Sequence, residues 1–234
     1  MAEGEECRKE DDKVRVDFHV HTEYSNDSFL TLRKLLKTVE RKGLDAIAIT
    51  DHDSMEAFAE LEQNEYYGCK VKVIKGCEFK TKIGDIIGIF ISKKLDYNSP
   101  RDLIRKIHKA GGVAIVPHPF KNDCRNEGFI KDNVKVIEVL NGRTGKRGNQ
   151  LAEKFAEKNH LIGIYSSDAH TSYELGRTYV EFDCKSLAEV KKRLLRREFR
   201  TVGKEVNPII LSFLRVAGAY KRLGFIGVIR RLLG

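Results

Sequence analysis

Short apolar runs and amphipathic helical segments alternate along this chain between residues 14 and 196. Residues 46–50 form a continuous apolar run of the kind found in buried parallel strands. Residues 31–42 place leucines at helical spacing behind Thr31, which can cap a helix. Alternating strands and helices predict parallel pairing in an α/β barrel or a doubly wound sheet, and about seven or eight strands favour the barrel.

The boundaries follow from the pattern of apolar residues and turn residues. The expected strands are residues 14–20, 46–50, 71–77, 86–91, 113–116, 134–140 and 161–165. The expected helices are residues 31–42, 55–66, 102–110, 149–158 and 186–196.

Polar residues that can bind metals stand where the predicted strands end. The chain has 7 histidines. His108 and His160 lie in or beside predicted helices, whereas the other histidines follow strands. In a parallel barrel the carboxyl ends of the strands form one rim, where barrel enzymes have their active sites. The residues expected at this rim are His19, His21, His52, Glu78, His118, Asp168 and His170.

The types of these residues indicate a chemistry. His19 and His21 are two positions apart on a strand, so both imidazoles point to the same face. Imidazoles mixed with carboxylates, without thiolates, favour Zn, Mn or Fe. A cluster of two or three such ions can bind a phosphoryl group, generate hydroxide near neutral pH and stabilise the leaving oxygen. The residues thus indicate metal-assisted phosphoester hydrolysis, with amide hydrolysis and deamination left open.

The order of the motifs resembles that of the PHP (polymerase and histidinol phosphatase) family. The resemblance extends over residues 14–183 and implies a distorted (β/α)7 barrel of PHP type in a compact, stand-alone, metal-dependent phosphoesterase. The motifs that carry it are Asp17-Phe-His-Val-His-Thr22, Ser25-Asn-Asp27, Thr50-Asp-His52, Gly76-Cys-Glu78, Pro117-His-Pro119, Ile137-Glu-Val-Leu-Asn141 and Ser167-Asp-Ala-His170.

The resemblance also implies a set of metal ligands. The first ion would be held by His19, His21, Glu78 and Asp168, which are also the expected catalytic residues. Glu78 would bridge to a second ion that is completed by His118. A third ion would be held by Asp27, His52 and His170.

Further residues have expected roles around these ions. Asp17 and Asp51 would orient the imidazoles. Asp85 stands where many members of the family have histidine, and a harder oxygen ligand there would favour Mn or Fe over Zn. An alternative is that Asp85 lies in a turn with Gly84 and binds no metal. Arg143 and Arg177 are the candidates for binding substrate phosphate, which suits the arginine fork.

The predicted function is hydrolysis of a phosphomonoester by a metal-bound hydroxide at a site with two or three divalent ions. The substrate would be a phosphorylated small molecule or a nucleotide. One alternative is a nuclease or nucleotide phosphatase that acts on short nucleic-acid ends. Another is a metal-binding interaction module without catalytic activity.

The net charge of +9 is confined to the end of the chain. Residues 185–234 contain 13 Lys/Arg and 3 Asp/Glu, so their net charge of +10 leaves −1 for residues 1–184. We expect a charged arm over residues 1–13, the barrel over residues 14–200 and a basic, partly apolar extension over residues 201–234. The extension has three open roles: packing on the barrel or in a homo-oligomer, peripheral contact with an anionic membrane, or binding nucleic acid.

The compartment is inferred from two features of the sequence. The first 13 residues are charged and contain no apolar run of the type found in a signal peptide. The 5 cysteines are an odd number and show no CxxC spacing. Both features predict a cytoplasmic protein with reduced cysteines.

Overall fold

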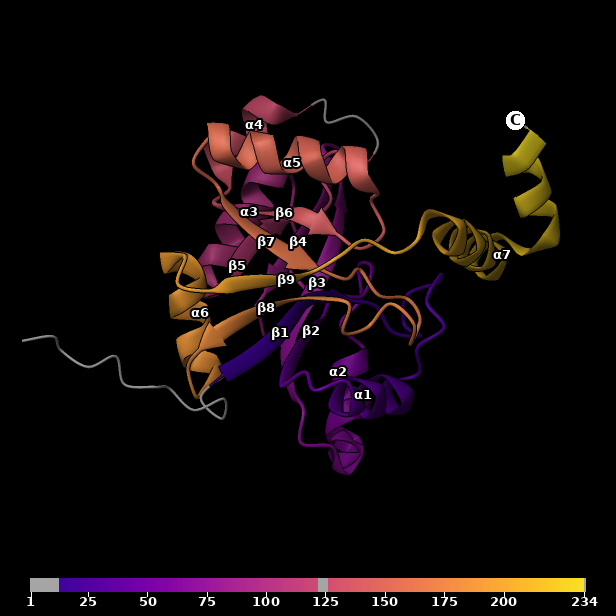
Figure 1. Cartoon of the computed structure of the whole chain (residues 1–234), viewed down its shortest axis with the longest axis horizontal. Coiled ribbons are helices and arrows are strands. Elements are labelled where there is room, and N and C mark those ends of the chain that lie inside the picture. Colours follow the sequence, from indigo (N-terminus) through magenta and orange to yellow (C-terminus); the bar gives the residue numbers. More distant parts are fainter. Residues whose placement is uncertain (1–12, 122–125, 234) are drawn as a thin grey trace, which may run out of the picture.

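The computed structural model describes residues 13–121 and 126–233, with side chains up to residue 224 (Figure 1). The predicted N-terminal arm therefore lies, except for Lys13, outside the described residues. The strands are β1 Lys13–Val20, β2 Ala46–Ile49, β3 Lys72–Thr81, β4 Gly84–Ile89, β5 Val113–Val116, β6 Val136–Asn141, β7 Ile162–Ser166, β8 Thr178–Asp183 and β9 Arg200–Gly203. The helices are α1 Leu32–Arg41, α2 Ala57–Gln63, α3 Pro100–Lys109, α4 Glu127–Asn133, α5 Lys146–Lys158, α6 Leu187–Arg196 and α7 Pro208–Leu233, with a 3₁₀ turn at Glu65–Gly68.

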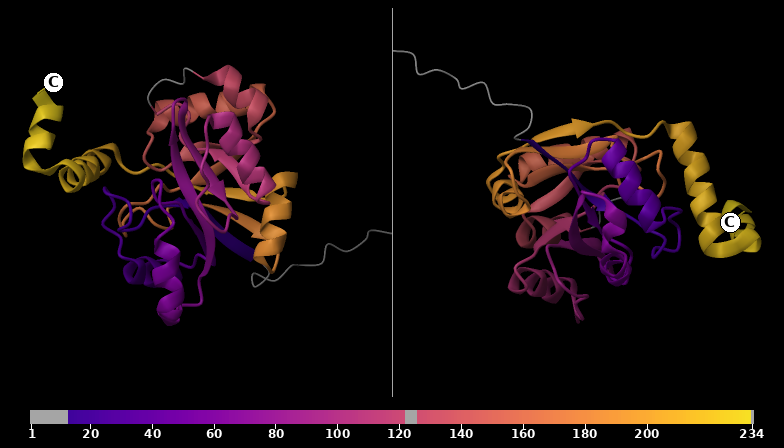
Figure 2. Two further views of the ribbon diagram at one scale, coloured as in Figure 1. Left: turned by 180° about the vertical axis from the view of Figure 1, so that it is seen from behind. Right: turned by 90° about the horizontal axis from the view of Figure 1, so that it is seen from below.

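The strands form a single sheet in the order β7-β6-β5-β4-β3-β2-β1-β8-β9. The sheet curls until β7 contacts β1, β8 and β9, so that it is nearly closed into a barrel. Helices α1 and α2 cover one side of it, and α3, α4 and α5 cover the other (Figures 1 and 2). The α/β barrel expected from the sequence is thus confirmed.

The expectation of parallel pairing holds for only part of this sheet. The pairs β1·β2, β2·β3, β5·β6 and β6·β7 are parallel. The pairs β3·β4, β4·β5, β1·β8 and β8·β9 are antiparallel. For β3·β4 and β4·β5, whose strands were expected, the prediction of parallel pairing was wrong. The link between β3 and β4 is too short for a parallel pair, which needs a long crossover, so β4 returns beside β3. The connection through α3 then leads into β5, which runs opposite to β4.

Strand β4 shows how this difference affects the rim. Only Lys82 and Ile83 separate β3 from β4, and Gly84 has a φ of 108°, in the region that favours glycine. The two strands therefore form a hairpin in which Lys80 lies opposite Asp85. As a result, the beginning of β4 lies at the same end of the barrel as the carboxyl ends of the parallel strands.

Strands β8 and β9 and helices α4 and α7 were absent from the expected elements, although the extension that contains α7 was expected as a separate segment. Strand β9 has 4 residues and helix α4 has 7, which leaves little periodicity to detect in the sequence. Strand β8 follows β7 without an intervening helix and fills the seam beside β1, where it pairs antiparallel. The helix predicted over residues 55–66 is shorter, because α2 ends at Gln63 and the 3₁₀ turn follows.

The interior of the barrel is filled by apolar side chains from most strands. Phe18 of β1 and Phe182 of β8 meet edge to face, with ring centroids 6.0 Å apart. Val16, Ile87 and Ile164 belong to the same buried cluster. This core lies beneath the rim and supports the polar side chains that stand above it.

Helix α7 lies outside the wall of the barrel and contacts its rim loops. An extended segment leads from β9 to this helix, which lies beside the rim loops (Figure 2). Gly224 interrupts it with a φ of 68° and a ψ of −179°. Among the described residues, no helix has the length and apolarity needed to cross a membrane.

We expect Phe182→Ala to lower the free energy of unfolding by about 3–5 kcal/mol, because it leaves a cavity beside Phe18. The measurement is urea denaturation followed by circular dichroism. Leu195→Ala on exposed α6 is the control and should change stability by less than ~0.5 kcal/mol. Equal effects of the two substitutions would contradict the packing of β8 against β1.

Candidate metal centre

The predicted ligands meet at the rim of the barrel. Four overlapping groups have ligand atoms within 4.8 Å of one another: His21, His52 and His170; His19, His118 and Asp168; His19, His21 and Glu78; and Glu78, Asp85 and His118. Asp27 joins the first group, since its Oδ1 lies 3.4 Å from His170 Nε2 and 3.6 Å from His52 Nε2. The structure therefore brings all the predicted ligands together.

One close contact in the cluster joins two imidazoles. His19 Nε2 lies 2.9 Å from His21 Nε2, and both side chains are fully buried. His19 Nδ1 lies 2.8 Å from the carboxylate of Glu138, which can only accept, so this nitrogen carries the hydrogen. Of the two ring nitrogens of His19, Nε2 therefore presents the lone pair in the neutral ring.

The same reasoning applies to His21. Its Nδ1 lies 3.0 Å from Ser25 Oγ, and that hydroxyl donates to Asp51 at 2.6 Å. Ser25 has one hydrogen, so it must accept from His21 Nδ1. When both rings are neutral, the two Nε2 lone pairs face each other, and this arrangement is repulsive unless a proton or a metal cation lies between them. Burial would lower the pKa of His19, but the carboxylates of Glu138, Asp168 and Glu78 raise it well above its usual range, so this position favours positive charge.

Glu78 has the same need for a cation. Its side chain is fully buried, and neither carboxylate oxygen has a hydrogen-bond partner. His52 Nδ1 approaches Oε2 to 2.8 Å and His118 Nε2 approaches Oε1 to 3.3 Å. Burial alone would raise the pKa of Glu78, but the imidazoles of His19 and His118 outweigh it and hold this pKa well below its usual range. A buried carboxylate that stays ionised without hydrogen bonds fits a metal ligand.

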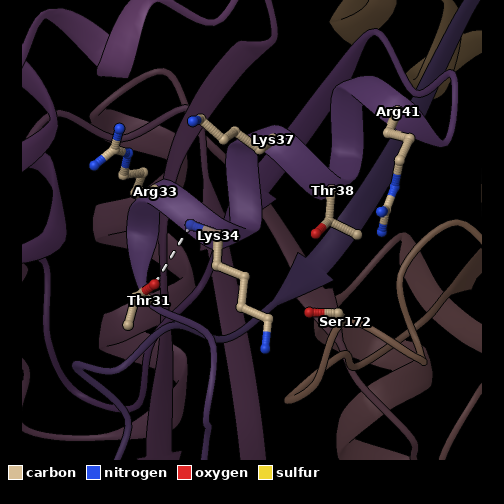
Figure 3. Close-up of a pocket in the computed structure, with 7 residues that line it drawn as sticks. All are labelled: Thr31, Arg33, Lys34, Lys37, Thr38, Arg41 and Ser172. Carbon is tan, nitrogen blue, oxygen red and sulfur yellow. Dashed lines mark hydrogen bonds between the residues drawn. The ribbon is translucent and has the colours of Figure 1, made fainter.

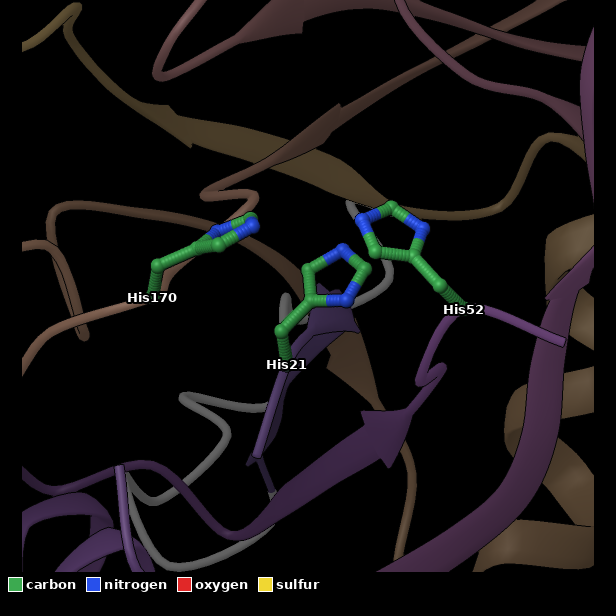
Figure 4. A group of neighbouring side chains, drawn as sticks. All are labelled: His21, His52 and His170. Carbon is green, nitrogen blue, oxygen red and sulfur yellow. The ribbon is translucent and has the colours of Figure 1, made fainter. Parts of the chain in front are cut away.

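Three imidazoles converge at the other side of the cluster, as Figure 4 shows for His21, His52 and His170. His170 Nδ1 donates to the backbone carbonyl of Asp168 at 2.8 Å, which leaves its Nε2 free to face Asp27. Asp27 Oδ1 is buried and has no hydrogen bond. This group thus also presents lone pairs without donors.

Asp51 and Asp17 stabilise the loops that carry the histidines. Asp51 accepts from Ser25 and from both the NH and the hydroxyl of Thr22, at 2.7 Å and 2.6 Å for the latter two. It therefore reaches His21 through Ser25. Asp17 Oδ1 accepts from the backbone NH groups of Ser167 and His19, at 3.1 Å and 3.3 Å. Burial raises the pKa of Asp17 to about 7.

Asp85 lies in the cluster because of the β3–β4 hairpin. It shares a potential ligand group with Glu78 and His118. Burial and the neighbouring charge of Glu78 raise the pKa of Asp85. A cation between the two carboxylates would remove that repulsion.

Glu138 is a functional residue that sequence reasoning did not single out. It is buried on β6, and its oxygens accept from His19 Nδ1, from the NH of His118 at 3.0 Å and from Asn141 Nδ2 at 2.8 Å. The available signal was a single acid within an apolar strand, because charged residues are seldom fully buried unless paired. Lys121 was also missed; its Nζ lies 3.5 Å from Asp168 Oδ2.

The two predicted substrate arginines lie in different surroundings. Arg143 is buried, and its Nη1 lies 3.0 Å from Glu174, which in turn accepts from the NH of His170 at 2.9 Å. Arg177 stacks on the ring of Tyr173 at 3.9 Å and donates to its carbonyl. Arg143 thus supports the loop that carries His170, whereas Arg177 lies outside the ligand cluster. Their binding of substrate stays a prediction.

Helix α7 crosses the mouth of the cluster. Gly218 packs on the backbone carbonyl of Asp27 so closely that a Cβ there would approach it to 3.1 Å. The exposed Arg215 donates to the carbonyl of Arg143, and its charge interacts with that of Asp168. Lys221 donates to the carbonyl of Ser28. The basic residues of this helix therefore include two that face the rim loops.

Comparisons with known proteins agree with this architecture. An uncharacterized protein of Methanocaldococcus jannaschii is 35% identical over 142 residues, which are 55% of this chain and 82% of the relative. A solved two-domain protein of Bacteroides vulgatus, described as containing a predicted PHP-like metal-dependent phosphoesterase, superposes with a TM-score of 0.69 at 21% identity, over 88% of this chain and 70% of that one. PsfC of Pseudomonas syringae superposes with a TM-score of 0.66 at 17% identity, over 88% of this chain and 98% of that one. These structural likenesses establish the fold.

The family model of the PHP domain matches residues 17–220, which include the entire ligand cluster and the first half of α7. The chain therefore belongs to the PHP domain family.

Proposed function

We propose that this protein is a metal-dependent phosphoesterase that hydrolyses phosphomonoesters. The observation that carries the proposal is the convergence of the Nε2 atoms of His19 and His21, 2.9 Å apart, with the carboxylate of Glu78, whose oxygens have no hydrogen-bond partner, inside a buried cluster. The name of the Bacteroides vulgatus neighbour, a predicted PHP-like metal-dependent phosphoesterase, supports it.

The residues that would hold the ions fall into three groups. His19, His21, Glu78 and Asp168 would hold one ion; Glu78, Asp85 and His118 a second; and Asp27, His52 and His170 a third. Divalent ions bound in this way polarise phosphoryl oxygens and lower the pKa of water, which is the chemistry that phosphoester hydrolysis needs. The mixed imidazole and carboxylate donors suit Zn, Mn or Fe, and Asp85 favours Mn or Fe.

The surrounding side chains would prepare the ligands for these ions. Glu138 and the Ser25–Asp51 pair hold the Nδ1 hydrogens of His19 and His21, so that both Nε2 atoms are available. No tautomer change is then required when an ion enters. The buried position of these partners also keeps them from exchanging with water.

Lys121 and Arg215 would bind the phosphate. Lys121 Nζ lies beside the carboxylate of Asp168, and the guanidinium of Arg215 on α7 interacts with the same carboxylate through its charge. An ammonium and a guanidinium on the same edge of the cluster can neutralise the phosphoryl oxygens that face away from the ions.

His19→Ala and His21→Ala should each abolish phosphatase activity and lower the metal content of the protein. The first measurement is metal per chain by plasma mass spectrometry, and the second is turnover of p-nitrophenyl phosphate with Mn, Zn, Fe or Mg. His108→Ala, at an exposed position of α3, should leave both the metal content and the turnover unchanged. Full metal content without turnover on any phosphoester would sink the proposed activity and leave a metal-binding module.

Glu138→Gln should weaken metal binding by about 10- to 100-fold, because the amide places a donor against Asn141 and the NH of His118 and disturbs His19. Competition with a chromophoric chelator measures the affinity. Glu189→Gln on exposed α6 serves as the matched control. An unchanged affinity in Glu138→Gln would show that this contact does not orient His19.

Arg215→Ala should lower kcat/KM for a phosphomonoester by about 10- to 100-fold, mainly through KM, because a charge-assisted hydrogen bond to phosphate is lost. Steady-state kinetics at fixed metal concentration measures it. Lys192→Ala removes the same charge from α6, which lies on the far side of the barrel from α7 (Figure 1), and should have no effect. A kcat/KM in Arg215→Ala equal to the wild-type value would exclude Arg215 from the phosphate site.

A further inference from the structure

Helix α7 carries a stripe of exposed apolar side chains. Among the large apolar side chains that are exposed in the described part of the chain, half belong to this one helix. Their spacing alternates between four and three residues, which places all of them along one face of a helix. A contiguous apolar surface of this kind marks a contact with another surface. The stripe consists of Ile209, Phe213, Val216, Tyr220 and Leu223, whose exposed fractions are 70%, 72%, 46%, 57% and 45%.

The opposite face of α7 is fixed to the rim loops of the barrel (Figure 2). Leu211 is buried, and Gly218 is buried against the backbone carbonyl of Asp27. Lys221 donates to the carbonyl of Ser28. Leu211 and Gly218 are seven positions apart and lie on the side of the helix that faces away from the stripe. The barrel therefore holds this helix in place without covering its apolar face.

The charge of α7 has a single sign. Residues 208–233 contain 5 Lys/Arg and no Asp/Glu. Among the described side chains of the helix, the cations are Arg215, Lys221 and Arg222, and their spacing puts them on the barrel side, so none interrupts the stripe. An apolar face opposite a face rich in Lys/Arg is the pattern of helices that lie in the interface of an anionic bilayer. The apolar side inserts among the headgroups, and the positive charge attracts the anionic surface.

A second copy of the chain fits the stripe less well than a membrane does. The stripe extends over about two heptads before Gly224 interrupts the helix with a φ of 68°, whereas a coiled coil is indicated by about three or four. The residues beside the stripe, Ser212, Ala217 and Ala219, are uncharged, so no ion pair is available to select a partner helix. Two copies of a helix without acidic residues would also repel each other.

A basic hollow along α1 differs from α7 in having charge without apolar surface (Figure 3). Its lining consists of cationic and hydroxyl-bearing side chains and contains no apolar residue. Because this hollow offers a bilayer nothing to insert, positive charge alone would bind a membrane only through screened attraction. It therefore provides a comparison for α7 in which charge is present and the stripe is not. Its cations are Arg33, Lys34, Lys37 and Arg41.

We propose that α7 docks this protein on the surface of an anionic membrane, with the apolar stripe inserted among the headgroups and the barrel on the water side. The helix lies on the bilayer and does not cross it, since in the part of the chain that the structure describes no helix is long and apolar enough to do so. The docking uses the outer face of α7, whereas the metal ligands lie beyond its inner face. The inference is therefore independent of the proposed phosphoesterase activity.

The test compares Phe213→Ser/Tyr220→Ser with the control Leu151→Ser/Leu195→Ser, which removes two apolar side chains from exposed positions of α5 and α6. Co-sedimentation of the full chain with vesicles of phosphatidylcholine and phosphatidylglycerol measures binding, and circular dichroism verifies that each variant is folded. The control should bind as the wild type does. Phe213→Ser/Tyr220→Ser should bind at least about tenfold more weakly, because less apolar area enters the bilayer.

A second arm separates the stripe from the charge. Vesicles of phosphatidylcholine alone should bind the wild type at least about tenfold more weakly than the anionic vesicles do, and added salt should weaken binding to the anionic vesicles. Lys34→Ala/Arg41→Ala removes two positive charges from the α1 hollow and leaves the stripe intact. It should bind anionic vesicles within about twofold of the wild type, because charges beyond a Debye length of the bilayer are screened.

Three results would overturn the inference. The first is that the wild type does not bind anionic vesicles, or binds them no better than Phe213→Ser/Tyr220→Ser does. The second is a loss in Lys34→Ala/Arg41→Ala as large as that in the stripe variant, because net charge alone would then explain the binding. The third comes from light scattering: a wild-type dimer that Phe213→Ser/Tyr220→Ser converts to a monomer would assign the stripe to a second copy of the chain.

Discussion

The need for positive charge between two buried imidazole nitrogens is the constraint on which the rest of the site depends. His19 and His21 could avoid it by rotating or by changing tautomer, but the partners of their Nδ1 atoms prevent both. Burial lowers the pKa of His21 well below its usual range, and His170 and His52 lower it further. Burial would also lower the pKa of His19, but the carboxylates of Glu138, Asp168 and Glu78 raise it, so without a metal the positive charge rests on His19. The ligands are therefore held in position for a cation before one binds. The stability of the packed core beneath the rim offsets the unfavourable energy of this arrangement.

The barrel meets this constraint by bringing ligands from many strands to one edge. Parallel strands deliver side chains from their carboxyl ends, as β1, β2 and β7 do. Strand β4 runs the other way and delivers Asp85 from its beginning, because the short hairpin after β3 places that beginning at the rim. A ligand can thus come from an antiparallel strand without disturbing the geometry of the others.

Local patterns in the sequence predicted the strands that carry histidines, because each motif directly follows an apolar run. They also placed the ligands at one rim, but they did not predict the hydrogen bonds that other side chains form with distant partners. The partner of Arg143 is Glu174, 31 positions away, and nothing near either residue indicates the pairing. Glu138 escaped notice for a similar reason, since its partner His19 lies 119 positions away. Strand β8 pairs antiparallel with β1 because the edge of β1 is open to it in the folded sheet, and no local pattern in the sequence indicates this.

The basic segment after the barrel places part of its positive charge at the rim, which its composition alone does not indicate. Arg215 and Lys221 of α7 bind carbonyls of rim loops, whereas the exposed Phe213 and Tyr220 lie on the other side of the helix. Arg215 of α7 and Lys121 therefore bring positive charge near Asp168 of the cluster from two parts of the chain. A phosphate drawn into this field meets positive charge from each element before it reaches the ligands, which raises its local concentration and orients it. The excess of positive charge is thus a property of the site's surroundings as much as of the chain's end.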